Sequence, residues 1–383
     1  MNNQNRVLIL AASAFTTLTL GAESVYQLGD SSHFHVMADV SAVYEDNVLL
    51  QSKGSEQDDL SLVFTPGVEL RMDSGGAAST LLRYQHSFVR YDKLSELDGD
   101  FAHLTFKTRY DSGVAMFNLS ASYKEEYSNS YGIDEALDIY GVNVLRDRIH
   151  VGADMKYQLS QLTALGVGVA YTDLDYDLDR FTDQTTLSVP LSVYYKVRPT
   201  LDLTAGVRYR ETDTSIDLKY EDWYYFVGAV GELFSPVFHA DLNFGFQDRS
   251  VKSGVMPNGD ADTTAYNLTV YYTGSAISTI YASLSRDYRT SADQALTYAY
   301  SSLSVGANFD LTQTITLNGS FALAKSEYEE SIREEDINIV RIGATYSPND
   351  YFKVSASYYF RDVDGNVVNY TNNEVRVTAS LRY

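Results

Sequence analysis

N-E-V-R-V-T-A-S-L-R-Y, residues 373–383, alternates strictly between apolar and polar side chains. The apolar positions are Val375, Val377, Ala379, Leu381 and Tyr383, and the residues between them are polar or charged. Successive side chains of a strand point to opposite faces, so this segment would have one apolar and one wet face. Its length is about that of a tilted strand crossing a bilayer. The stretch therefore predicts a membrane-spanning β-strand that ends on an aromatic residue.

The same two-residue period recurs along nearly the whole chain after His33. Residues 34–44 and residues 201–209 are clear examples, and many apolar faces begin or end in Tyr or Phe and are aliphatic between. Aromatic residues at strand ends are typical of the two girdles of a transmembrane barrel. The pattern predicts an all-β fold, an antiparallel up-and-down transmembrane β-barrel of about 18 strands, with 16 or 20 as alternatives.

The connections alternate between short turns and longer polar segments. Short ones, such as Asp73–Gly76 and Ser347–Asp350, contain Gly, Pro or Asn, which favour tight turns. Long ones include 47–59, 128–145, 175–183, 212–222 and 288–295. Short turns on one side and long loops on the other are typical of outer-membrane barrels. Pro66 and Pro190 fall inside predicted strands, where a missing N–H removes a ladder hydrogen bond, and we expect bulges or kinks there.

Composition narrows the function classes. The chain has 383 residues, no cysteine, and 29 basic against 51 acidic residues, for a net charge of −22. Such an acidic chain is not expected to bind nucleic acid, and the lack of cysteine excludes disulfides and thiolate metal sites. Residues 1–22 read as a signal peptide, with Arg6 before an apolar run and a cut after Gly21 or Ala22, which leaves residues 23–383 as the barrel.

Several short motifs resemble a β-barrel porin family of Gram-negative outer membranes. They are Thr65-Pro66-Gly67, Arg146-Asp147-Arg148, Asp173-Leu174-Asp175-Tyr176-Asp177, Phe234-Ser235-Pro236 and the terminal Leu381-Arg382-Tyr383. The resemblance covers most of the mature chain. It implies an outer-membrane channel, often linked to exopolysaccharide production and export, and carries over no catalytic residue. It also implies that Leu381 and Tyr383 act as the signal read by the barrel-assembly machinery, and that the partners are outer-membrane lipid and lipopolysaccharide.

If the apolar faces point to lipid, a set of cations points into the lumen. This predicted channel lining is Arg71, Arg83, Lys107, Arg109, Lys124, Lys156, Lys196, Arg208, Arg210, Arg341, Lys353 and Arg376, with Arg382 beside it. A basic lining would favour anions, whereas pairing across the lumen would remove that selectivity. Inward-facing tyrosines could also form a saccharide path, or simply fill space. They are Tyr194, Tyr224, Tyr271, Tyr281 and Tyr359.

Other chemistry has weaker support. Asp173, Asp175, Asp177 and Asp179 form a candidate metal loop, but Leu178 and Gln184 occupy positions where a calcium loop needs Gly and Glu. The six histidines show no metal-ligand spacing beyond His33-x-His35, and no catalytic or cofactor motif occurs. We therefore expect no enzyme and no cofactor. The sequence favours a channel for passive passage of small hydrophilic solutes or saccharides, and the alternative is a non-conducting structural or adhesin-like surface protein with acidic loops.

Overall fold

The computed structural model describes residues 26–27, 31–73, 75–128, 139–253, 259–329 and 331–383. The predicted signal peptide, residues 1–22, lies outside the described residues. Among the described residues, no helix is long and apolar enough to cross a membrane.

The chain forms one closed antiparallel barrel of 18 strands, as the alternation predicted. A two-residue strand, β1 (Tyr26–Gln27), pairs beside the first of them. The barrel strands are β2 (Ser32–Glu45), β3 (Asp59–Asp73), β4 (Ala78–Tyr91), β5 (Gly99–Asp111), β6 (Ala115–Tyr127), β7 (Leu145–Gln158), β8 (Thr163–Tyr176), β9 (Gln184–Arg198), β10 (Leu201–Thr214), β11 (Leu218–Glu232), β12 (Phe238–Ser253), β13 (Gly259–Tyr272), β14 (Ser278–Thr290), β15 (Thr297–Asp310), β16 (Ile315–Tyr328), β17 (Glu334–Tyr346), β18 (Phe352–Gly365) and β19 (Asn369–Arg382).

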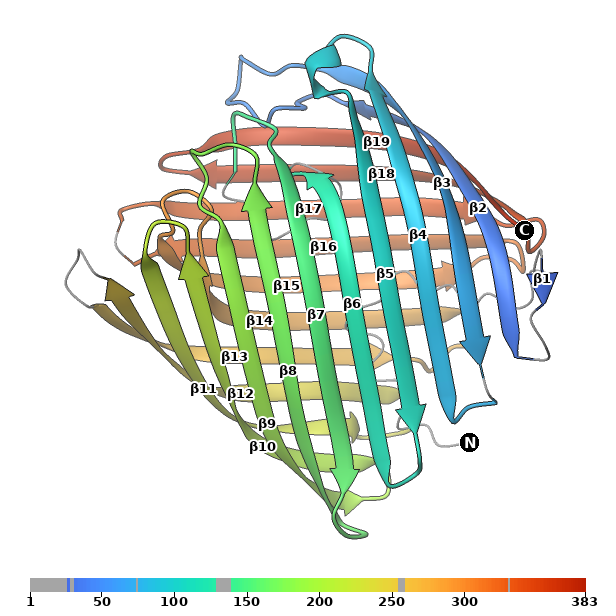
Figure 1. Cartoon of the computed structure of the whole chain (residues 1–383), viewed down its shortest axis with the longest axis vertical. Coiled ribbons are helices and arrows are strands. Elements are labelled where there is room, and N and C mark those ends of the chain that lie inside the picture. The colour runs from blue at the N-terminus through green and yellow to red at the C-terminus, as the bar shows by residue number, and fades with distance from the viewer. Residues whose placement is uncertain (1–25, 28–30, 74, 129–138, 254–258, 330) are drawn as a thin grey trace.

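The strands are strongly tilted. In Figure 1 the strands of the near wall cross those of the far wall at a steep angle, which is the expected consequence of tilt in a closed barrel. Each strand pairs with its sequence neighbour, so the topology is up-and-down. We call the end with the short turns, such as that between β3 and β4, the turn side, and the opposite end the loop side. The amino end of β2 and the carboxy end of β19 both lie on the turn side.

The barrel is closed by a seam between β2 and β19. Their register runs from Glu374 opposite Glu45 to Arg382 opposite Met37. Tyr383 completes it, because its N–H donates to the Val36 carbonyl at 2.9 Å and its carbonyl accepts from the Val36 N–H at 2.7 Å. Leu381 points outward and is 56% exposed, as its phase in the alternation requires.

The two strand prolines do not form bulges, which corrects the sequence expectation. Pro66 keeps its register with Ala38, and Pro190 keeps its register with Arg208. On the other side of each proline the ladder has only a local gap, and pairing resumes in the same register. At the Pro66 gap the Thr65 and Ser87 hydroxyls hydrogen-bond at 2.9 Å. A side-chain bond there bridges the place where the proline has no N–H to donate.

Several predicted loops are shorter than the sequence suggested. The segment 212–222 is mostly strand, because β10 continues to Thr214 and β11 begins at Leu218. Polar residues at these strand ends hid the alternation. The strands therefore extend beyond the apolar band from which they were recognised.

Candidate functional site: the lumen of the barrel

The two faces of the wall differ in chemistry. Outward-facing apolar side chains are exposed, with Val227 at 64%, whereas the inward-facing Glu69 and Asp222 are fully buried. A barrel of this size is too wide for side chains to fill it with an apolar core. Its interior is instead lined with charged and polar groups, and these are the candidate functional residues.

On the turn side, one carboxylate gathers three of the inward cations. Glu69 on β3 contacts Arg71 at 3.3 Å and Arg382 at 2.6 Å, and it also accepts hydrogen bonds from Arg83 on β4. These residues come from β3, β4 and β19, so the cluster fixes the wall beside the seam. The three guanidinium partners offset the cost of burying this carboxylate.

Most of the other predicted lining cations also pair with neighbouring carboxylates. Arg109 lies 3.6 Å from Asp111, Lys156 lies 3.0 Å from Asp202, Arg376 lies 2.9 Å from Glu374, and Lys124 pairs with Glu126. Arg341 lies over the Tyr359 ring, 5.2 Å from its centroid. Lys353 is in register with Ser380 of β19. Lys107 on β5 and Lys196 on β9 have no ion pair among the residues that the structure describes.

The loop side holds a feature that the alternation did not predict. β14 pairs with β13 only between Tyr272 and Tyr266, although both strands continue toward the loop side. Above this point the end of β14 lies against the inner face of β12, whereas β15 stays paired with β16 as far as Tyr298. There the Tyr288 N–H donates to the side chain of the inward-facing Gln247 at 3.2 Å. Ser291 and Ala295 are fully buried. We call residues 287–300 the inner hairpin.

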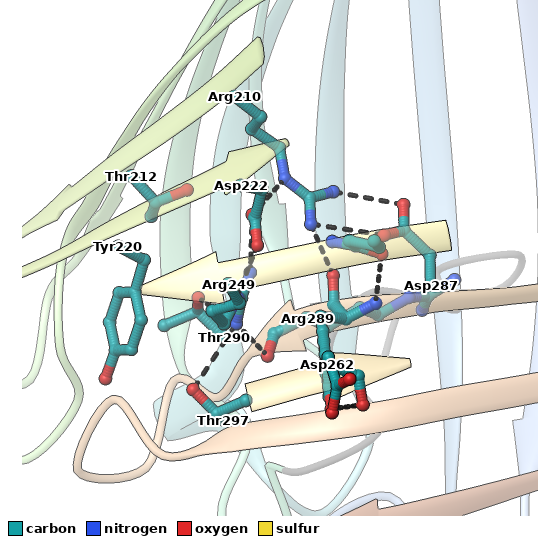
Figure 2. Close-up of polar contacts among 12 residues, drawn as sticks. Arg210, Thr212, Tyr220, Asp222, Arg249, Asp262, Asp287, Arg289, Thr290 and Thr297 are labelled. Carbon is teal, nitrogen blue, oxygen red and sulfur yellow. Dashed lines mark hydrogen bonds and ion pairs between the residues drawn. The ribbon is translucent and has the colours of Figure 1, made fainter. Parts of the chain in front are cut away.

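Ion pairs attach the inner hairpin to the wall, as Figure 2 shows. Asp287 lies 3.1 Å from both Arg208 and Arg210 of β10. Arg210 also contacts Asp222 of β11 at 2.7 Å, and Arg249 of β12 contacts the same carboxylate at 2.7 Å. The predicted lining residues Arg208 and Arg210 therefore belong to a partly buried network.

Backbone groups complete this attachment. Arg210 donates to the Tyr288 carbonyl at 2.6 Å, and Arg249 donates to the Arg289 carbonyl at 2.9 Å. These carbonyls belong to the part of β14 that has left β13 and still pairs with β15. The network holds the hairpin by its backbone as well as by its charges.

The loops of the loop side pack on the inner hairpin. Phe181, in the β8–β9 connection, forms a β-bridge with Asp293, and the Thr182 N–H donates to the Ala292 carbonyl at 2.8 Å. An apolar cluster forms around them, consisting of Ile139, Val144, Tyr176, Phe181 and Ala292. A second cluster joins Leu50 to residues of β15–β19. Side chains from several connections thus narrow the loop-side mouth.

Arg333 ties three connections together outside the strands. It contacts Glu335 through a 2.6 Å hydrogen bond, Asp293 of the inner hairpin at 3.8 Å, and the ring of Tyr140 at 5.2 Å from the centroid. Burial lowers the pKa of Arg333, but the neighbouring Tyr328 and Glu335 outweigh burial, so that its pKa lies above the ordinary value. The guanidinium stays charged at any physiological pH.

The turn side contains an open cavity of about 370 Å³. Its lining comes from the ends of β5–β7 and from β9–β12, and includes Lys156, Tyr194, Asp202, Phe226, Asp241 and Asn243. The two halves of the lumen therefore differ, with a packed loop side and an accessible turn side.

Comparisons with known proteins agree with this geometry. Residues 224–383 match the family model described as "Putative beta-barrel porin 2". The match covers less than half of the chain. The match begins within β11 and includes the inner hairpin and the closing strand, and it confirms the resemblance that the sequence motifs indicated. No curated protein sequence matches the chain.

Solved structures of outer-membrane proteins share the porin-like fold. Pseudomonas aeruginosa OccK2 (OpdF), solved in complex with glucuronate, is 11% identical, with 92% of this chain and 97% of that chain covered and a TM-score of 0.52. A BenF-like porin from Pseudomonas fluorescens Pf-5 is 8% identical, with 91% and 99% covered and a TM-score of 0.51. The chain spans 62% of the length of the Neisseria meningitidis FrpB iron transporter, which is 11% identical with a TM-score of 0.49 and 88% of this chain covered.

The candidate metal loop has a different place in this porin-like barrel. Asp173 and Asp175 lie in strand β8, so only Asp177 and Asp179 of the four belong to the connection that follows. Asp173 accepts a hydrogen bond from Thr185 at 2.7 Å. In the described part of the chain, no three acidic or histidine side chains are grouped closely enough to hold a metal ion. The expectation of a single acidic loop was wrong because the strand extends through alternating aspartates.

The predicted tyrosine path does not form a continuous surface in the lumen of the barrel. Tyr224, Tyr271 and Tyr359 are buried by their neighbours. Tyr194 and Tyr281 are half-buried and lie over glycines of adjacent strands, Gly166 and Gly306. The inner hairpin was not predicted from the sequence, although one signal was present. Ala292, Ala295 and Leu296 make that connection unusually apolar for an exposed loop.

Proposed function

We propose that the chain is an outer-membrane channel for the passive passage of small hydrophilic solutes, with the inner hairpin as its constriction. The observation that carries the proposal is the attachment of this hairpin inside a wide, charged lumen through Asp287, Arg208 and Arg210. A hairpin held against the inner face of the wall narrows the lumen and so limits the size of what can pass. Fixed charges of both signs at that point also act on charged solutes.

The cellular setting belongs to the same proposal. The mature barrel, after removal of residues 1–22, would lie in the outer membrane of a Gram-negative bacterium with its loop side facing lipopolysaccharide. The barrel-assembly machinery would recognise the closing strand through Leu381 and Tyr383. The family resemblance adds saccharides, and a link to exopolysaccharide export, to the solutes worth testing. No enzymatic step forms part of this function.

A second candidate is a non-conducting surface protein, and one observation favours it. The connections of the loop side pack into two apolar clusters around the inner hairpin, which is an arrangement that also suits a sealed mouth. In this alternative the acidic loops bind a partner and the lumen conducts nothing.

Conductance of the purified barrel in planar bilayers separates the two. We expect stepwise current from the wild type and larger steps from Asp287→Asn, because the neutral amide loosens the hairpin from both arginines. Asp39→Asn is the matched control, since Asp39 is an inward carboxylate of β2 far from the hairpin. Absence of current from every variant would support the surface protein. Equal steps from the two variants would show that the hairpin does not set the constriction.

A further inference from the structure

The turn-side cavity has a chemical character of its own. Two aromatic rings of its wall occupy the space that glycines of neighbouring strands leave. A Cβ built on Gly166 would lie 2.9 Å from the Tyr194 ring, and one on Gly206 would lie 2.6 Å from the Phe226 ring. Both side chains line the cavity.

The same cavity is acidic, although the sequence predicted a net basic lumen. Asp111, Asp202, Glu232 and Asp241 line it, and Lys156 is its only lysine or arginine. Lys196, the register neighbour of Asp202, is not among the lining residues. Low-dielectric walls around carboxylates raise the local concentration of cations.

Asp202 has a buried carboxylate oxygen that a ligand in the cavity could bind. It is only 7% exposed, and its Oδ2 lies 3.0 Å from the Lys156 ammonium. Its buried Oδ1 has no hydrogen-bond partner. A buried carboxylate oxygen without a partner is costly, so a donor that enters the cavity would gain a strong interaction there.

Lys156 shows which donor fits. Its ammonium lies against Asp202 and also 4.0 Å from the centroid of the Tyr194 ring. The cavity therefore already accommodates one ammonium group between a carboxylate and an aromatic face, which is the arrangement that favours organic cations. Asp241, whose Oδ1 accepts from Asn243 at 3.0 Å, places a second carboxylate among the lining residues.

We propose that this cavity binds organic solutes that carry a primary ammonium group. The ammonium donates to Asp202 and Asp241, and the carbon skeleton packs on Tyr194 and Phe226. The inference rests on the proposed channel function, because solutes must enter the lumen to reach the cavity. It names the class of solute that the turn side binds. It also reverses the anion preference that the basic residues of the sequence suggested.

Titration calorimetry of the purified barrel tests the binding without requiring conduction. The probes are n-butylammonium, n-butyrate as its counterpart of opposite charge, and glucose as a neutral polyol. We expect n-butylammonium to bind more tightly than either of the others, and Asp202→Asn to weaken it by about tenfold or more. Asp39→Asn, which removes a carboxylate elsewhere in the lumen, leaves the affinity unchanged. Circular dichroism confirms that each variant keeps its β-structure.

Lys156→Gln should change the affinity for n-butylammonium in the opposite direction to Asp202→Asn. If Lys156 only supports the fold, its removal leaves binding the same or weaker. If the cavity selects ammonium groups, removal of the resident one tightens n-butylammonium binding by about threefold or more. Equal binding of n-butylammonium and n-butyrate, a preference for glucose, or no effect of Asp202→Asn would overturn the inference. Selective binding by a barrel that carries no current would leave the inference standing and overturn the channel.

Discussion

The loop-side and turn-side halves of the lumen use the same residue types for different purposes. On the loop side, Asp222 and Arg249 are almost fully buried and hold a hairpin in place. On the turn side, Lys107 is exposed and Asp202 keeps an oxygen without a partner. The difference teaches that the number of charges on a barrel wall does not define its selectivity. Charged side chains that form ion pairs within the wall neutralise one another, and only the unpaired charged side chains act on a solute.

The largest effect should follow from breaking the loop-side network. Asp222→Ala leaves Arg210 and Arg249 without their shared carboxylate, and an unpaired buried charge costs about 3–5 kcal/mol. We expect a loss of unfolding free energy of that order, measured by urea denaturation of the purified barrel. Asp39→Ala, at a half-buried carboxylate near the middle of β2, should change it by less than about 0.5 kcal/mol. Similar losses from both would contradict the contrast between the halves.

A smaller effect should follow from filling the turn-side wall. In Gly206→Val, the new side chain meets the Leu191 carbonyl, 2.5 Å from the Cβ position, and pushes the Phe226 ring toward the lumen. We expect a cost of about 1–3 kcal/mol and a lower single-channel conductance. Gly319→Ala is the control, because its Cβ would meet only the Arg341 carbonyl at 3.6 Å. Normal conductance in Gly206→Val would show that Phe226 can move without narrowing the path.

Charge reversal at Lys107 should alter selectivity without altering stability. Lys107→Glu removes a cation that holds no carboxylate, so we expect the reversal potential in a salt gradient to shift toward cations. The unfolding free energy should stay within about 0.5 kcal/mol of the wild type. Arg109→Glu, next to it on the inner face, faces Asp111 and should destabilise as well. If only Arg109→Glu shifted the selectivity, the charge that acts on solutes would belong to Arg109 and not to Lys107.

The smallest effect concerns an ion pair on the loops. Lys93 hydrogen-bonds the Asp58 carboxylate at 2.5 Å and lowers its pKa, and both side chains are exposed to solvent. A lowered pKa in the folded state gives stability above the unfolded pKa, which is lost as pH falls through the folded one. Solvent screens this pair, so Lys93→Ala should raise the pKa of Asp58 in an NMR titration and leave thermal stability unchanged. A clear change of melting temperature would contradict this assignment.

The sequence predicted the strands of the barrel wall but not the hairpin and the ion pairs inside it. The strands, their faces and the seam follow from a two-residue period, because a closed sheet between lipid and water imposes that period on every strand. The network of Asp287 with Arg208 and Arg210 joins residues more than 70 positions apart, and no local pattern specifies it. Asp175 was assigned to a loop for a related reason, since polar residues at a strand end carry no apolar face to recognise.

The seam has a consequence for how the molecule reaches its final form. The hydroxyls of Ser41 and Thr378 meet across it at 2.8 Å although they are 337 positions apart. Hairpins of neighbouring strands form locally, but this pairing needs the ends of the sheet to find each other, and the entropy of closing so long a loop makes it slow. Until it forms, β2 and β19 are two open edges able to pair with any other strand. The pairing of the last strand therefore ends the period in which the chain can misassemble. Until then the open edges of β2 and β19 must be protected from other strands if the barrel is to form.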